Sequence, residues 1–208
     1  MSGSALARRT RIVRRAIVFW MTVLVVTGTA HAQTRAQKGD PSRGTAKAAA
    51  CMSCHGAPGR PPLPGMPTLA GQQAEFLVMQ MFLMREGLRE VPLMAGLLKN
   101  FSDRDLEDVA AHFSSQAPLL DRGKRDPQRY TRGAALAQGM ACGSCHLADY
   151  RGQRHIPRIT DQREDYLATT LQAYRDDKRS GADTSMNAAM YNVTDSDIRA
   201  LAHYLAQQ

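Results

Sequence analysis

All four cysteines of the chain fall in two copies of the pattern Cys-x-x-Cys-His, at 51–55 and 142–146. One short helical turn can present both thiols, and each thiol can form a thioether with a haem vinyl group. The histidine that follows directly can bring its imidazole to the iron. The pattern is typical of c-type haem attachment, and it predicts two covalently bound haem c groups held by Cys51, Cys54, His55, Cys142, Cys145 and His146.

Three other uses of paired cysteines remain open, although each explains less of the pattern. A four-cysteine zinc site usually joins its pairs across about 15 to 20 residues, whereas Cys54 and Cys142 lie 88 positions apart. A thioredoxin-like pair needs no following histidine and sits in a βαβ context, and a structural disulfide is the third alternative. Two haem motifs predict instead a protein that moves electrons.

Residues 1–32 have the features of an export signal. Five arginines between 8 and 15 form a positive region, an apolar run follows at 16–26, and Ala30-His31-Ala32 forms a cleavage signal. The alternative is an uncleaved anchor, but a bilayer needs roughly 20 apolar residues. We expect a cleaved signal peptide at 1–32 and a periplasmic protein, since thiols destined for haem must leave the reducing cytosol.

The charge of the chain changes once the leader is removed. The sequence has 27 Lys plus Arg and 19 Asp plus Glu, and five of the basic residues lie in 1–32, which leaves 22 against 19. No Gly-rich phosphate loop or basic-aromatic stripe is present, so nucleic-acid binding is not expected. Behind the second haem motif lies a basic cluster of Arg151, Arg154, Arg158 and Arg163. Such a run is usually a plain solvated face, and the alternative hypothesis is that an acidic partner docks near it.

A repeat of about 91 residues organises the mature chain. The segment SDRDLEDVAAHF at 102–113 recurs 92 positions later as TDSDIRALAHYL at 194–205, and the haem motif recurs after 91 positions. A stretch rich in Pro, Gly and charge at 117–129 is typical of a linker. The repeat predicts two homologous domains, 33–121 and 122–208.

Each half shows helical patterns and lacks strand patterns. Ser102 and Thr194 can cap the two closing helices, with Asp105 and Asp197 three residues on. Apolar residues follow at i, i+3, i+4 and i+7. The predicted fold class is all-α, with two tandem cytochrome c domains each wrapped around a covalently bound haem, and further helices at 43–50, 73–87, 127–139 and 163–179.

Two methionines occupy one point of the repeat. Met94 and Met186 each lie eight residues before the cap of a closing helix, and they follow the haem histidines by 39 and 40 residues. A thioether there would complete Met/His ligation of the iron and raise its potential. Met190 competes in the second half, but its repeat equivalent is Leu98, which cannot ligate iron.

Two prolines follow the haem histidines at similar spacing. Pro67 lies 12 residues beyond His55, and Pro157 lies 11 residues beyond His146. A carbonyl there could accept the Nδ1 hydrogen of the histidine, which would fix the ring and raise its basicity. The alternative is that both are ordinary loop prolines.

Together these motifs resemble the dihaem class I cytochromes c, and in particular the cytochrome c4 family. The resemblance covers nearly all of 35–208 through C-x-x-C-H, P-x-L-A-G-Q, the methionine before the cap and the closing helix. It implies class I domains that face each other about a pseudo-twofold axis and exchange electrons quickly. ITDQ at 159–162 replaces L-A-G-Q in the second half, so different packing is expected around the second haem.

The resemblance implies an electron-transfer protein that is not an enzyme. It would carry one electron per haem from a respiratory donor, such as a cytochrome bc1-type complex, to an acceptor such as an oxidase, meeting the membrane only through these partners. One alternative is the electron-accepting subunit of a periplasmic dehydrogenase. The other is a haem peroxidase, whose catalytic groups or alternative ligands would come from His112, His155 and His203.

Overall fold

The computed structural model describes residues 39–57, 59, 61–118, 122–179 and 184–208, so the expected signal peptide lies outside the described residues. No helix in these ranges is long and apolar enough to cross a membrane. The same ranges contain no β-strand. Their helices are α1 (Pro41–Ala48), α2 (Met52–His55), α3 (Ala74–Arg85), η1 (Pro92–Met94), α4 (Asp103–Ser114), α5 (Pro127–Gly139), α6 (Gly143–His146), α7 (Glu164–Arg175), α8 (Ser185–Met190) and α9 (Asp195–Ala206).

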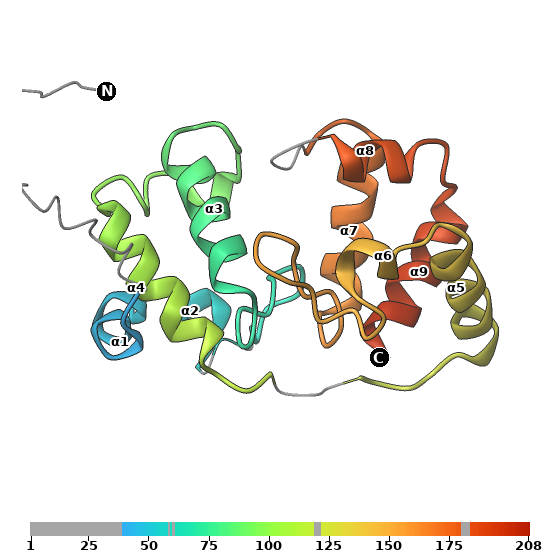
Figure 1. Cartoon of the computed structure of the whole chain (residues 1–208), viewed down its shortest axis with the longest axis horizontal. Coiled ribbons are helices and arrows are strands. Elements are labelled where there is room, and N and C mark those ends of the chain that lie inside the picture. Colours follow the sequence, from blue (N-terminus) through green and yellow to red (C-terminus); the bar gives the residue numbers. More distant parts are fainter. Residues whose placement is uncertain (1–38, 58, 60, 119–121, 180–183) are drawn as a thin grey trace, which may run out of the picture. The chain divides into compact units, whose positions relative to one another are not determined.

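The helices gather around two separate hydrophobic cores (Figure 1). The blue-to-green helices α1 to α4 enclose one core, in which Leu106, Val109 and Phe113 of α4 are almost fully buried. The yellow-to-red helices α5 to α9 enclose the other, around Ile198 and Leu201 of α9. In each group the closing helix packs on the first helix and on the long middle helix. The helical periodicity read from the sequence therefore describes the fold correctly.

Side chains cap the two closing helices where the sequence indicated. Ser102 and Asp105 form a reciprocal capping box at α4, whereas Thr194 accepts from the backbone N–H of Asp197 without the second bond. Asp40 caps α1, and Asp126 caps α5 in the same way, each followed by a proline at the first helical position.

In both halves a glycine of the first helix lets its backbone lie directly against the backbone of the closing helix. A Cβ added to Gly44 would lie 2.0 Å from the carbonyl oxygen of Asp108 in α4. A Cβ added to Gly133 would lie 2.1 Å from the carbonyl oxygen of Ala200 in α9. Asp108 and Ala200 are repeat equivalents, so the two halves share one crossing geometry.

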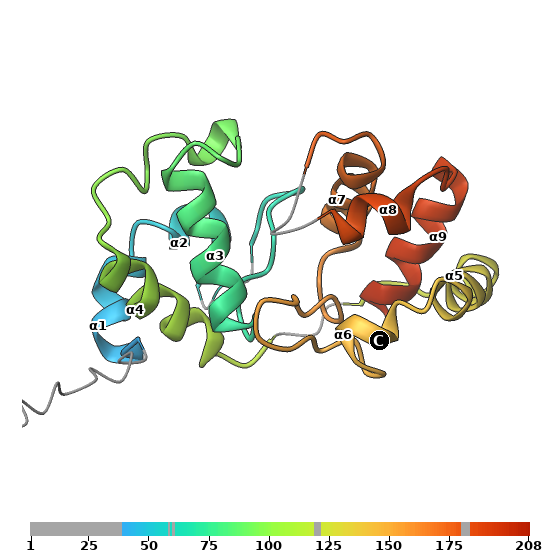
Figure 2. The same ribbon diagram turned by 45° about the horizontal axis from the view of Figure 1, so that its top comes forward.

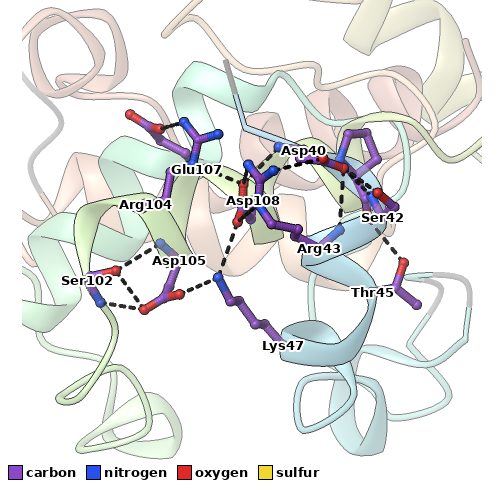
Figure 3. Close-up of polar contacts among 11 residues, drawn as sticks. Asp40, Ser42, Arg43, Thr45, Lys47, Ser102, Arg104, Asp105, Glu107 and Asp108 are labelled. Carbon is purple, nitrogen blue, oxygen red and sulfur yellow. Dashed lines mark hydrogen bonds and ion pairs between the residues drawn. The ribbon is translucent and has the colours of Figure 1, made fainter. Parts of the chain in front are cut away.

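The first crossing is also held by charge (Figure 3). The Asp108 carboxylate has no exposed surface, and it accepts from Arg43 Nε at 2.9 Å and from the backbone N–H of Asp40 at 2.8 Å. The hydrogen bond from the Arg43 guanidinium is the main reason that the pKa of Asp108 lies well below its usual range. Lys47 of α1 adds a second ion pair at 3.2 Å.

Replacing the crossing glycine is expected to destabilise the protein. Gly133→Ala should lower the free energy of unfolding by about 2 to 3 kcal/mol, because the added methyl group meets backbone atoms that cannot move alone. Gly139→Ala is the matched control in the same helix, since no atom lies within 4 Å of its added Cβ. Guanidinium melts of the holoprotein, followed by helical circular dichroism, measure both. Equal effects of the two substitutions would contradict the crossing geometry.

Removing the Asp108 charge is expected to cost about 1.5 to 3 kcal/mol at neutral pH, because the charge-assisted hydrogen bonds from Arg43 and Lys47 are lost. Since the folded pKa of Asp108 is depressed, its contribution is complete above the unfolded carboxyl pKa of about 4 and is lost as the pH falls below it. The difference between wild type and Asp108→Asn should therefore shrink in acid. Glu107→Gln is the control, because Glu107 is 37% exposed and should change stability by less than about 1 kcal/mol.

Candidate haem sites

The two cysteine pairs lie at the starts of two equivalent short helices. Cys51 precedes α2 and Cys142 precedes α6, and both pack partly buried against different hydrophobic cores. Cys54 and Cys145 are exposed, and no disulfide joins any of the four cysteines. Burial raises the pKa of the Cys51 and Cys142 thiols. Because the two pairs belong to different cores, they do not converge on a single zinc ion.

Both motif histidines are buried and anchored through one ring nitrogen. His55 Nδ1 lies 3.1 Å from the carbonyl oxygen of Pro67, and His146 Nδ1 lies 2.9 Å from that of Pro157. A carbonyl only accepts, so Nδ1 carries the hydrogen and Nε2 keeps its lone pair. Burial lowers the pKa of both histidines, against the opposing effect of the carbonyl bonds. Each ring is thereby held through Nδ1, and Nε2 is left available to a metal.

The chain leaves each motif through the same unusual backbone conformation. Gly56 follows His55 with φ 70° and ψ 161°, and Leu147 follows His146 with φ 68° and ψ 161°. This region is essentially restricted to glycine, and a side chain there costs about 1 to 3 kcal/mol. The second half thus carries strain directly beside its histidine.

The predicted methionines lie at the rims of the two cores. Met94 ends η1 and Met186 lies in α8, and each is partly buried against the core of its own half. Met190, the competing methionine, is instead buried within the core. It is 2% exposed, and its repeat equivalent Leu98 is 3% exposed. Met190 therefore fills the same core position as a leucine.

Two glutamines that the sequence analysis did not single out connect the halves. Gln72 bonds to the backbone of Arg158, and Gln162 bonds to the backbone of Thr68. The loops that carry them follow α2 and α6 and lie next to each other (Figure 2). Both glutamines end the segments P-x-L-A-G-Q and ITDQ, so their retention in both halves was the available signal.

The change from L-A-G-Q to ITDQ keeps the backbone conformation. Gly71 has φ 67°, and its counterpart Asp161 has φ 54°. Aspartate tolerates the left-handed region better than most residues. The carboxylate of Asp161 also pairs with Arg158 and, at 3.3 Å, with Arg122. The expected difference in packing is therefore a local ion-pair cluster on an unchanged loop path.

Two arginines, one from each half, lie near the hydroxyl of a single tyrosine. Arg179 Nη1 donates to the Tyr166 hydroxyl at 3.3 Å, and the positive charge of Arg89, its repeat equivalent, acts on the same hydroxyl. Burial opposes ionisation, but the positive charges of Arg179 and Arg89 outweigh it and lower the pKa of Tyr166 to about 8. Arg179 Nε is buried without a hydrogen-bond partner.

The four arginines behind the second motif differ in exposure and in their partners. Arg151 and Arg154 are exposed, whereas Arg158 is only 20% exposed and pairs with Asp161. Arg163 binds Asp165 at 2.8 Å. Half of the expected docking face is therefore used in contacts within the protein.

Two of the remaining histidines have structural roles. His203 is 1% exposed, accepts at Nε2 from the backbone N–H of Asp126 at 2.9 Å and contacts Glu164 through Nδ1 at 2.8 Å. His112 lies beside Thr45 at the α1–α4 crossing, 3.1 Å from its hydroxyl. Both are occupied in helix contacts, while His155 is exposed.

Known proteins share this chain's sequence and fold. A family model described as cytochrome c matches residues 130–208. Cytochrome c4 of Pseudomonas aeruginosa is 38% identical over 200 residues, which cover 91% of this chain and 96% of the relative. The chain belongs to the cytochrome c4 family.

Two further comparisons extend this result. The crystal structure of reduced cytochrome c4 from Pseudomonas stutzeri matches with a TM-score of 0.75 at 34% identity, covering 80% of this chain and 97% of that structure. A thiosulfate dehydrogenase electron acceptor of Thiomonas intermedia is 30% identical, over 78% of this chain and 80% of the relative. The predicted family, the class I cytochrome c fold and the electron-transfer class are confirmed.

This cytochrome binds two covalently attached haem c groups. The residues present fit them, because each half holds two free thiols at one short helix, a histidine with Nε2 available, and a thioether at the rim of the same core. A bound haem supplies an iron that is reduced and oxidised by one electron. The protein supplies anchoring, ligand orientation and a shielded site.

Relief of the strain at Leu147 is expected to stabilise this cytochrome. Leu147→Gly should raise the free energy of unfolding by about 1 kcal/mol, since a relief of about 1 to 3 kcal/mol is partly offset by the greater freedom of glycine in the unfolded chain. Gly56→Ala should do the reverse in the first half. Denaturant melts of the holoprotein test both, and a less stable Leu147→Gly variant would argue against strain at this position.

Proposed function

We propose that this cytochrome is a periplasmic carrier that takes up one electron per haem and is not itself a catalyst. Its two haem domains are residues 33–121 and 122–208, exported by a signal peptide at 1–32 that is then removed. Cys51, Cys54, Cys142 and Cys145 form the thioethers, while His55 with Met94 and His146 with Met186 are the axial pairs. Pro67 and Pro157 orient the histidines.

The duplicated histidine anchor carries this proposal. In both halves the ring is buried, neutral and fixed through Nδ1, which is the state that a permanent iron ligand requires. The core positions of Leu98 and Met190 leave Met94 and Met186 as the equivalent thioethers. An iron with two protein ligands has no open position for a substrate, which favours electron transfer over peroxidase chemistry.

The arginines beside Tyr166 support placement of the haem carboxylates between the halves. Arg89 and Arg179 bring two positive charges to one buried hydroxyl, and Arg179 Nε lacks a partner. Haem propionates are anionic and accept charge-assisted hydrogen bonds. We propose that these arginines hold them.

The partners we propose are a respiratory donor such as a cytochrome bc1-type complex and an acceptor such as an oxidase. A second role, as the electron-accepting subunit of a dehydrogenase, is favoured by the similarity to the electron acceptor of thiosulfate dehydrogenase from Thiomonas intermedia. Gel filtration of periplasmic extract separates the two roles. A free carrier elutes at its own mass, and a subunit elutes with a larger protein.

The axial ligands can be tested by spectroelectrochemical titration of the matured protein with and without carbon monoxide. Wild type is expected to show two haems by mass, two high-potential one-electron steps and no carbon monoxide binding. Met94→Ala and Met186→Ala should each lower one potential, because Met ligation favours the reduced iron, and should each open one haem to carbon monoxide.

Met190→Leu is the matched control for the second half. It keeps a similar volume at a buried position where the first half already has Leu98, and both potentials should stay as in wild type. If Met190→Leu opened a haem to carbon monoxide and Met186→Ala did not, Met190 would be the ligand.

A further inference from the structure

The peptide group that anchors each motif histidine is also held from the opposite half of the chain. In the first half, the carbonyl of the Pro67–Thr68 peptide accepts from His55 Nδ1 at 3.1 Å. The N–H of the same peptide donates to Gln162 Oε1 at 2.8 Å. Gln162 Nε2 then donates to the Thr68 carbonyl at 3.0 Å.

The second half repeats this arrangement with the roles exchanged. The carbonyl of the Pro157–Arg158 peptide accepts from His146 Nδ1 at 2.9 Å. Its N–H donates to Gln72 Oε1 at 2.7 Å, and Gln72 Nε2 donates to the Arg158 carbonyl at 2.9 Å. Gln72 and Gln162 are 5% and 8% exposed, so water competes little for these bonds.

The orientation of each glutamine amide is fixed by a further bond. The oxygen of Gln72 also accepts from the backbone N–H of Gln73 at 2.9 Å, and that of Gln162 accepts from the N–H of Arg163 at 3.0 Å. With two N–H groups on the oxygen and a carbonyl on the nitrogen, the amide cannot be reversed without losing all three bonds.

These bonds form a chain from the glutamine of one half to the histidine of the other. Hydrogen bonds in series polarise one another, so a peptide whose N–H donates to a glutamine is a stronger acceptor at its carbonyl. A stronger bond at Nδ1 raises the basicity of the ring as a ligand. Hydrogen bonding around an axial ligand is one of the protein's controls on haem potential.

We propose that Gln72 and Gln162 are positioning residues that act across the two halves, each setting the reduction potential of the haem in the opposite half. The proposal rests on the proposed function, because it takes His55 and His146 as iron ligands. It makes the potential of each haem depend on how the two halves are joined.

The test uses the matured holoprotein with Gln162→Ala and Gln72→Ala. Gln162→Ala is expected to favour reduction of the first-half haem, shifting its ratio of reduced to oxidised form about threefold at a fixed electrode potential. The second-half haem should keep its wild-type ratio. Gln72→Ala should give the mirror result. Met94→Ala and Met186→Ala, which each move one step, assign the two steps to the halves.

Gln73→Ala is the matched control for a general loosening between the halves. Gln73 Nε2 also bonds across them, to the carbonyl of Arg151 at 2.9 Å and of Gly152 at 3.3 Å, without touching either histidine-bound peptide. It should leave both potentials unchanged. Gln162→Leu keeps the side-chain volume without the amide. It should show the shift expected of Gln162→Ala, and it replaces the alanine variant if that variant folds poorly.

Amide hydrogen exchange gives a second readout. The N–H of Thr68 should exchange faster in Gln162→Ala, and that of Arg158 faster in Gln72→Ala. Absent shifts, shifts in the haem of the same half, or equal shifts from Gln73→Ala would overturn the inference. If the methionine variants behave as expected and the glutamine variants do not, only this inference falls, whereas unresponsive methionine variants would refute the proposed ligation.

Discussion

The backbone contact between the first and closing helices of each half is the constraint on which the rest of the structure depends. Gly44 and Gly133 lie against the carbonyls of Asp108 and Ala200, at a distance that no side chain allows. The first helix leads within a few residues into the cysteine pair. The crossing therefore places the haem-binding motif beside the core that the closing helix builds.

The two halves stabilise this shared crossing by different means. In the first half, the buried carboxylate of Asp108 collects the cations of α1. In the second half alanine stands at that position, and the buried His203 bridges Asp126 and Glu164 instead. Since the backbone geometry is the same, the contact depends on glycine, and the polar networks around it are free to differ.

The histidine-bound peptides connect ligand chemistry to the association of the halves. A carbonyl fixes each histidine, and the same peptide uses its N–H to hold a buried glutamine of the other half. One peptide group thus serves ligand orientation and domain contact together. Any movement between the halves changes the environment of both histidines, which suits a protein that passes single electrons between partners.

The sequence by itself determined the haem motifs, the two homologous halves, the helices and the caps, because covalent chemistry and helical periodicity are local properties. It offered a carbonyl beside each histidine as one of two alternatives, and the structure shows the carbonyls of Pro67 and Pro157 there. It did not reveal the partners of Gln72 and Gln162. Their contacts join residues about 90 positions apart in the chain, and spacing carries no information about which loops meet. Only the tertiary structure decided them, because the folding of both halves brings their loops together.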